Sequence, residues 1–69
     1  QNNPVRTGQV LEVRVEEPHG LNTNDGIARY NGLVINIDGG GELVGERVTL
    51  EVYKIQRTSA RARILKVGR

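Results

Sequence analysis

Asp25-Gly-Ile-Ala-Arg-Tyr30, Asn31-Gly32 and Leu33-Val-Ile-Asn-Ile37 follow one another in the middle of the chain. The two outer runs are rich in β-branched and aromatic residues, which favour strands. Between them, asparagine and glycine tolerate the positive φ that both central residues of a type I′ turn require. Residues 25–37 therefore predict a tight β-hairpin with its turn at Asn31-Gly32.

Strands are also expected on both sides of the hairpin. Residues 8–17 alternate apolar and polar side chains, which is the pattern of a half-buried strand. Residues 47–57 also fit helical spacing, but their β-branched residues and the glycines before them favour a strand. A phase shift between Val52 and Ile55 predicts a bulge there. From Ala60 the alternation resumes and predicts the last strand.

Two segments between the strands are interpreted as loops. Residues 18–24 are rich in turn-forming residues, and residues 38–42 hold three glycines in a row. The second segment is expected to be a flexible connection. It does not predict a phosphate-binding loop, because the lysine and helix that such a loop needs do not follow.

Five short strands with frequent turn signals predict an all-β fold, and closure would remove the exposed strand edges. We expect a small, five-stranded antiparallel barrel with an OB-like architecture over residues 8–67. A mobile lead-in would precede it at residues 1–7, and a tail would follow at residues 68–69. The side chains expected to face inward are Leu11, Val13, Val15, Ile27, Val48, Leu50, Val52, Ala60, Ala62 and Ile64, with Leu33 and Ile35 in the core or at its rim.

The composition excludes several kinds of site. The chain of 69 residues has no cysteine and one histidine, so disulfides, zinc clusters and Ser-His or Cys-His pairs are excluded. Glu16 and Glu17 are expected to point to opposite faces of a strand and so not to form an acid-base pair, and His19 to be a solvated turn residue. We expect no catalysis, no metal and no cofactor. A membrane span and a secretory signal are absent from the sequence, which favours a soluble, cytoplasmic monomer.

Charge is unevenly distributed along the chain. The net charge is only +2, but all acidic residues lie between Glu12 and Glu51. From Tyr53 onward every charged residue is basic: Lys54, Arg57, Arg61, Arg63, Lys66 and Arg69. Such a run is either an ordinary solvated face or a surface for a polyanion, and the alternation places Arg61 and Arg63 on one outward face.

Three pieces of the sequence resemble the TRAM domain in their order and spacing. They are Asp25-Gly-Ile-Ala-Arg29, Leu33-Val-Ile35, and Leu43-Val-Gly-Glu-Arg-Val48 leading to Lys54 and Arg57. The TRAM domain is a small β-barrel appended to tRNA-modifying methyltransferases and methylthiotransferases, and it also occurs alone in small archaeal proteins. The resemblance spans Pro4 to Val67. It implies RNA binding, and the stand-alone archaeal members resemble bacterial cold-shock proteins as RNA chaperones.

The sequence departs from the archaeal TRAM proteins that it resembles where they commonly carry aromatic residues, at Leu33, Asn36, Ser59 and Arg61. The only aromatic rings of the chain belong to Tyr30 and Tyr53. Because aromatic rings form the stacking platform for unpaired bases, binding is expected to depend mainly on phosphate contacts.

The resemblance and the charge pattern together predict RNA contacts, with tRNA or rRNA as the partner. The residues expected to bind RNA are Arg29, Lys54, Arg57, Arg61, Arg63 and Lys66, with Tyr30 and Tyr53 as candidate stacking residues. Arg29 also has a structural interpretation, in which it pairs with Glu12, Glu16 or Glu51.

Three roles stay open at this point. The chain could be an RNA chaperone, or it could dock on a protein through an exposed strand edge. It could also be the accessory module of a larger modifying enzyme or nuclease. Residues 56–60 are similar to TRAM domains fused behind PIN-type nuclease domains, which implies an attached catalytic domain.

Overall fold

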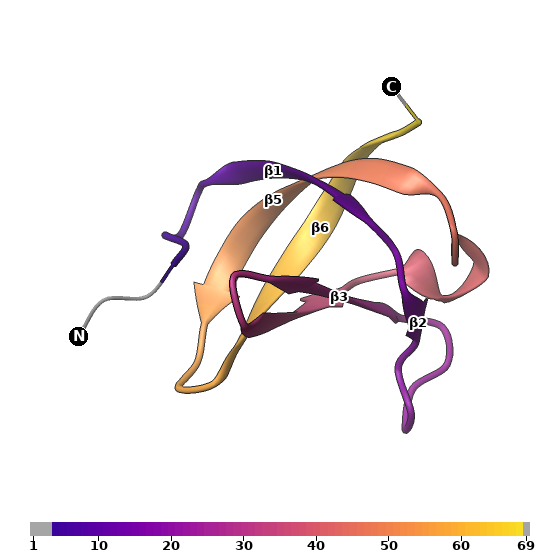
Figure 1. Ribbon diagram of the computed structural model, residues 1–69, viewed down its shortest axis with the longest axis horizontal. Coiled ribbons are helices and arrows are strands. Elements are labelled where there is room, and N and C mark those ends of the chain that lie inside the picture. Colours follow the sequence, from indigo (N-terminus) through magenta and orange to yellow (C-terminus); the bar gives the residue numbers. More distant parts are fainter. Residues whose placement is uncertain (1–3, 69) are drawn as a thin grey trace.

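The computed structural model describes residues 4–68 and consists of one six-stranded mixed sheet (Figure 1). The strands are β1 (Val10–Arg14), β2 (Glu17–Pro18), β3 (Gly26–Tyr30), β4 (Leu33–Ile37), β5 (Arg47–Ile55) and β6 (Ser59–Val67). A single 3-10 turn, η1 (Gly40–Glu42), lies between β4 and β5. The strand order is β1-β5-β6-β4-β3-β2. The expected all-β, OB-like barrel is confirmed, with six strands in place of five.

The sheet closes on itself at the junction of β1 and β2. These strands stand at opposite ends of the strand order, although only Val15 and Glu16 separate them in the chain. The N–H of Val15 donates to the carbonyl of Glu46 on the β5 side, and the N–H of Glu16 donates to the carbonyl of Ile27 in β3. The continuous strand expected over residues 8–17 is therefore interrupted at Val15 and Glu16. Its two parts, β1 and β2, belong to the two opposite edges of the sheet and so connect them.

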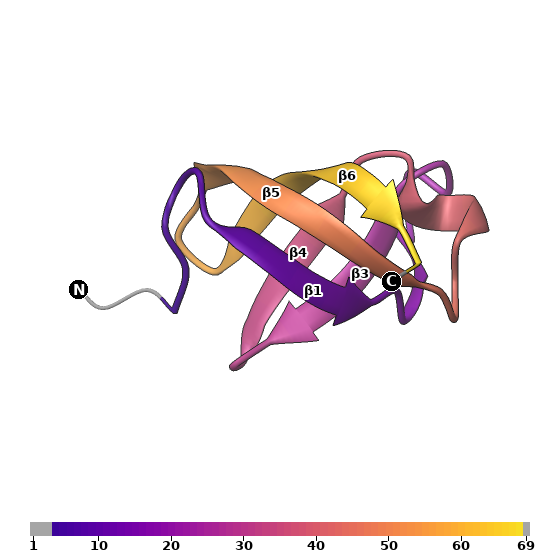
Figure 2. The ribbon, with the colours of Figure 1, turned by 90° about the horizontal axis from the view of Figure 1, so that it is seen from above.

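Two layers are visible when the barrel is seen from above. The β3–β4 hairpin lies beneath the layer formed by β1, β5 and β6 and crosses it steeply (Figure 2). Its turn has φ of 50° at Asn31 and 84° at Gly32, which confirms the expected type I′ geometry. The expected bulge in β5 is also confirmed, because the register with β6 shifts between Val52 and Lys54.

The expectation that all strands are antiparallel is wrong for one pair. β4 and β6 run parallel, from Val34 beside Ser59 to Ile37 beside Ala62. The reason is that the connection over residues 38–46 leads into β5 at one end of the barrel, so that β6 starts at the opposite end, where β4 also starts. Two ends can therefore be distinguished. The turn end holds residues 4–9, 30–33 and 54–60, with turns at 31–32 and 56–58, and the loop end holds residues 19–25 and 38–46 (Figure 1).

The core confirms most of the expected inward side chains and corrects one of them. The buried apolar residues are Val5, Leu11, Val13, Val15, Ala28, Leu33, Ile35, Ile37, Val48, Leu50, Val52, Ala60 and Ala62. Ile27 was expected to face inward and is only half-buried, because Ala28 takes the inward position opposite Ile35. Ile64 faces inward as expected and packs against the core, although it is only half-buried.

Packing begins before residue 8, where the barrel was expected to start. Residues 1–3 of the expected lead-in lie outside the described part of the chain, but Val5 is only 1% exposed and belongs to the core. The N–H of Gly8 donates to the carbonyl of Val52. At the other terminus, the N–H of Gly68 donates to the carbonyl of Arg47, whereas Arg69 lies outside the described residues.

The glycine run was expected to be a flexible connection, and this expectation is wrong. Gly40 is buried, and the N–H of Gly41 donates to the carbonyl of Asn24 at 2.9 Å. A Cβ on Gly41 would meet the backbone of Thr23 far inside contact distance. The glycines are thus required for the close approach of two backbones at the loop end, and the segment is well packed.

Candidate nucleic-acid interface

The outer face of the sheet is built from alternate residues of β4, β5 and β6. Because side chains alternate along a strand, Ser59, Arg61 and Arg63 project outward while Ala60 and Ala62 fill the core. Asn36 of β4 lies beside Arg61 in the register. The alternation found in the sequence therefore placed these side chains on the correct face.

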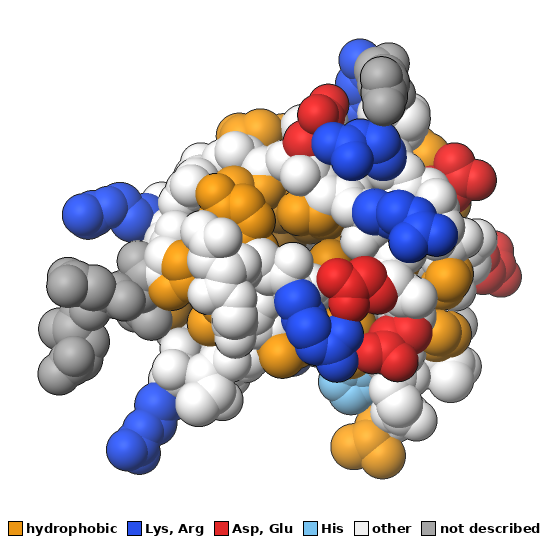
Figure 3. Space-filling model, viewed as in Figure 1, with side chains coloured by type: hydrophobic (Ala, Val, Ile, Leu, Met, Phe, Trp, Pro, Cys, Tyr) orange, Lys and Arg blue, Asp and Glu red, His pale blue; other side chains and the backbone are white. Residues whose placement is uncertain are grey.

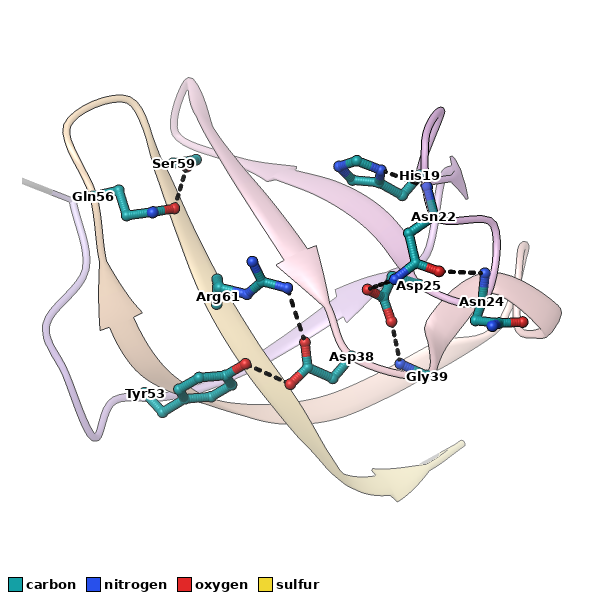
Figure 4. Close-up of polar contacts among 10 residues, drawn as sticks. All are labelled: His19, Asn22, Asn24, Asp25, Asp38, Gly39, Tyr53, Gln56, Ser59 and Arg61. Carbon is teal, nitrogen blue, oxygen red and sulfur yellow. Dashed lines mark hydrogen bonds and ion pairs between the residues drawn. The ribbon is translucent and has the colours of Figure 1, made fainter.

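A tyrosine from β5 crosses this face. The hydroxyl of Tyr53 donates a hydrogen bond to Asp38 Oδ2, and Asp38 directly follows β4, on the other side of β6 (Figure 4). Arg61 Nη2 lies 3.9 Å from Asp38 Oδ1, and the guanidinium carbon of Arg63 lies 4.7 Å from the centroid of the Tyr53 ring. The ring of Tyr53 is therefore held over β6 by contacts with the side chains of Asp38 and Arg63.

The hydrogen bond to Asp38 raises the pKa of the Tyr53 hydroxyl above its ordinary value, and partial burial acts in the same direction. The hydroxyl therefore stays protonated as a hydrogen-bond donor at neutral pH. Arg63 lies over the Tyr53 ring, and Asp38 accepts a hydrogen bond from its hydroxyl. Tyr53 therefore connects β5 to the end of β4 across the outer face.

Arg29 lies in an ion-pair cluster with two glutamates. Its guanidinium donates to Glu16 Oε1 at 2.6 Å and to Glu17 Oε2 at 3.2 Å, and its backbone N–H donates to Glu16 Oε2 at 3.0 Å. The structural interpretation of Arg29 is thus confirmed for Glu16. The expectation that Glu16 and Glu17 point to opposite faces is wrong, because the chain leaves the strand pattern at Val15 and Glu16.

This cluster predicts a pH-dependent contribution to stability. Hydrogen bonds from the backbone and then the side chain of Arg29 lower the pKa of Glu16 below its ordinary value. Ionised Glu16 therefore stabilises the fold above its unfolded-state pKa, and that contribution is lost as pH falls through the folded-state pKa. We expect the Glu16→Gln variant to melt below the wild type at pH 7, and the difference to shrink as the pH is lowered towards 3, in thermal scans at both pH values.

Glu42→Gln is the matched control for this variant. Glu42 is exposed, and among residues 4–68 it forms no ion pair. The Glu42→Gln variant should have the same thermal midpoint as the wild type at both pH values. A pH-independent difference between Glu16→Gln and the wild type would contradict the role assigned to the Glu16 carboxylate.

The basic side chains fall into paired and unpaired groups. Ion pairs join Arg63 to Glu51 at 3.3 Å and Arg47 to Glu12 at 3.3 Å, besides those of Arg29 and Arg61. Among residues 4–68, no carboxylate lies within 4.0 Å of the side chains of Arg6, Arg14, Lys54, Arg57 and Lys66.

The structure does not bring the six predicted RNA-binding residues into one group. Lys54 and Arg57 lie at the turn end, Arg61 and Arg63 lie in the middle of the outer face, and Lys66 lies towards the loop end. Arg29 lies on β3. Arg6, a cation of the turn end, was missed because residues 1–7 show no periodicity in the sequence.

The four positions at which the resembling archaeal proteins carry aromatic residues differ in their exposure to solvent. Leu33 is only 6% exposed and belongs to the core, so its side chain is not available on the surface. The other three, Asn36, Ser59 and Arg61, are neighbours on the outer face. Tyr30 is half-buried at the turn end and packs against the core.

Polar contacts at the loop end fix the start of β3. Asp25 accepts hydrogen bonds from the side-chain amide of Asn22 and from the N–H of Gly39, at 3.1 and 3.0 Å (Figure 4). His19 was expected to be a solvated turn residue, and its Nδ1 accepts hydrogen bonds from the N–H groups of Leu21 and Asn22. These side chains therefore order the loop that carries the Asp-Gly-Ile-Ala-Arg motif.

The TRAM domain family model matches residues 4–65, so the chain belongs to the TRAM domain family. A search among curated proteins finds no match. TRAM domains are generally RNA-binding modules, and they bind rather than catalyse. Within residues 4–68, no helix has the length and apolar character needed to cross a membrane.

Proposed function

We propose that this domain binds RNA chiefly through the phosphate backbone, and that its cations on and around the β5–β6 hairpin make the contacts. The observation that carries the proposal is the run of residues from Tyr53 to Val67, which contains five basic residues and no acidic one. Within this run Lys54, Arg57 and Lys66 have no carboxylate partner among residues 4–68. Unpaired exposed cations can neutralise phosphates without first giving up an ion pair.

Membership of the TRAM family supports RNA as the polyanion. The scarcity of aromatic side chains on the outer face supports phosphate contact over extensive base stacking, because Tyr53 is occupied by Asp38 and Arg63. The ion pairs of Arg29, Arg61 and Arg63 make them secondary contacts, since RNA must displace a carboxylate to reach them fully.

We further propose tRNA or rRNA as the natural partner, met in the cytoplasm. The domain would act either as an RNA chaperone or as the substrate-binding module of a modifying enzyme or nuclease. The resemblance to TRAM domains supports both roles, because these domains occur alone as well as fused to enzymes. The two roles differ in a direct assay. A chaperone accelerates the melting of a misfolded RNA hairpin by itself, whereas an accessory module binds without such an effect.

The alternative is a barrel that docks on a protein through a strand edge. After Ala62, β6 extends past its pairing with β4, and the exposed apolar residues Leu65 and Val67 lie in that extension. Protein docking predicts an affinity that changes little with salt. Direct binding of tRNA by the purified domain at low ionic strength, with no binding of a neutral polymer, supports the RNA proposal, and its absence refutes it.

Replacing Arg61 and Arg63 together by alanine is expected to weaken RNA binding by roughly 3- to 10-fold, measured by fluorescence anisotropy with labelled tRNA. The thermal midpoint should change by only a few degrees, because exposed ion pairs contribute less than about 1 kcal/mol each. The modest loss reflects the engagement of both arginines with carboxylates.

The matched control is the double variant Arg14→Ala with Arg47→Ala, which removes the same charge from β1 and β5 near the loop end. It should bind RNA more tightly than the Arg61/Arg63 variant. A large loss of stability with unchanged RNA affinity in the Arg61/Arg63 variant would show that these arginines are purely structural.

A further inference from the structure

Charge is segregated along the length of the barrel. The segments that form the turn end, residues 4–9, 30–33 and 54–60, contain Arg6, Lys54 and Arg57 and no acidic residue. In the space-filling view, basic side chains project at this end and the visible acidic side chains lie away from it (Figure 3). The turn end is thus the part of the molecule where a polyanion meets the least repulsion.

Backbone pairing brings the three segments of the turn end together. The parallel register of Val34 with Ser59 sets the β3–β4 turn beside the β5–β6 turn. The N–H of Gly8 donates to the carbonyl of Val52, and the N–H of Val52 donates to the carbonyl of Gln9. These bonds hold residues 4–9 beside the end of β5, so that Arg6, Lys54 and Arg57 share one end of the barrel.

Tyr30 lies at the same end and differs from Tyr53 in what surrounds it. Tyr30 is the last residue of β3, and its side chain lies on the inward face of the strand, as that of Ala28 does. It packs against the core while staying partly exposed. In the part of the chain that the structure describes, the Tyr30 hydroxyl forms no side-chain hydrogen bond and no cation lies over its ring. Its partly exposed ring is therefore not engaged by these contacts, and an unpaired base can reach it at the turn end.

We infer that the turn end is the primary RNA site of this domain, and that it receives a single-stranded segment. An unpaired base stacks on Tyr30, and the flanking phosphates contact Arg6, Lys54 and Arg57. Because the bases of a continuous duplex present no free face, duplex RNA binds this end more weakly. The inference rests on the proposed RNA binding and adds to it a location, a new contact residue in Arg6, and a preference for unpaired RNA.

The location is tested with two double variants that remove the same charge. Arg6→Gln with Arg57→Gln changes the turn end, and Arg14→Gln with Arg47→Gln changes the loop-end half of the barrel. Binding of a labelled ten-nucleotide oligouridine is measured by anisotropy at constant salt, after thermal scans show that both variants are folded. We expect the first variant to lose at least tenfold in affinity and the second to lose less than threefold.

The outcomes separate the two proposals. Equal losses in both variants would overturn the turn-end site while leaving RNA binding through net charge intact. Failure of the wild type to bind oligouridine and tRNA at low salt would overturn the proposed function and this inference together.

Stacking on Tyr30 is tested by its own fluorescence. The chain has two tyrosines and no tryptophan, so in the variant Tyr53→Phe all tyrosine emission comes from Tyr30. Oligouridine is expected to quench this emission on binding, and a blunt RNA duplex of equal charge is expected to leave most of it. The variant Tyr30→Leu, which keeps an apolar side chain against the core, should bind oligouridine about tenfold more weakly. Oligouridine binding without quenching, with Tyr30→Leu binding as the wild type does, would overturn the assignment of Tyr30.

Discussion

Gly41→Ala is expected to lower the free energy of unfolding by about 2–3 kcal/mol, which is a large share of the stability of so small a domain. A methyl group on Gly41 would meet the backbone of Thr23, and neither backbone is free to move. The N–H of Gly41 donates to the carbonyl of Asn24, and the carboxylate of Asp25 holds the N–H of Gly39. The clash must therefore break hydrogen bonds or displace the start of β3.

Thermal unfolding followed by circular dichroism measures this effect, and the midpoint should fall by about 10 to 20 °C. Gly20→Ala is the matched control, because a Cβ at Gly20 meets no atom within 4 Å and should leave the midpoint nearly unchanged. Equal midpoints for the two variants would show that the glycine run is loosely packed, as the sequence alone suggested.

The hairpin was predictable because its turn chemistry is local. Asn31 and Gly32 adopt the positive φ that their residue types tolerate, and nothing distant is needed to explain it. The phase of β3 was not predictable in the same way. Ile27 is the more apolar residue, but the register that pairs Ala28 with Ile35 determines which side chain enters the core.

The outward face of β6 was also predictable, since alternation separates Arg61 from Ala60 and Ala62. Its ion pairs were not, because Asp38 and Glu51 come from other parts of the sheet and only the register brings them near. The parallel pairing of β4 with β6 was missed for the same reason, and with it the grouping of Lys54 and Arg57 with Arg6 at one end of the barrel.

RNA affinity is expected to fall steeply with salt, and this is the second large effect. If about three to five phosphates are contacted, counterion release gives a slope of log K against log[salt] of roughly −2 to −3.5 for single-stranded RNA. Between 50 and 200 mM salt the affinity would then drop by about 20- to 130-fold. The contacts come from exposed side chains such as Lys54 and Arg57, so no burial shields them from the added ions.

The most direct test of phosphate-based RNA binding is the dissociation constant of the purified wild-type domain for a labelled single-stranded RNA at four salt concentrations from 50 to 200 mM. We expect a straight line of slope −2 or steeper on the logarithmic plot, with the Lys54→Gln, Arg57→Gln variant giving a shallower line. An affinity that is unchanged across this range, or no binding at 50 mM salt, would contradict it.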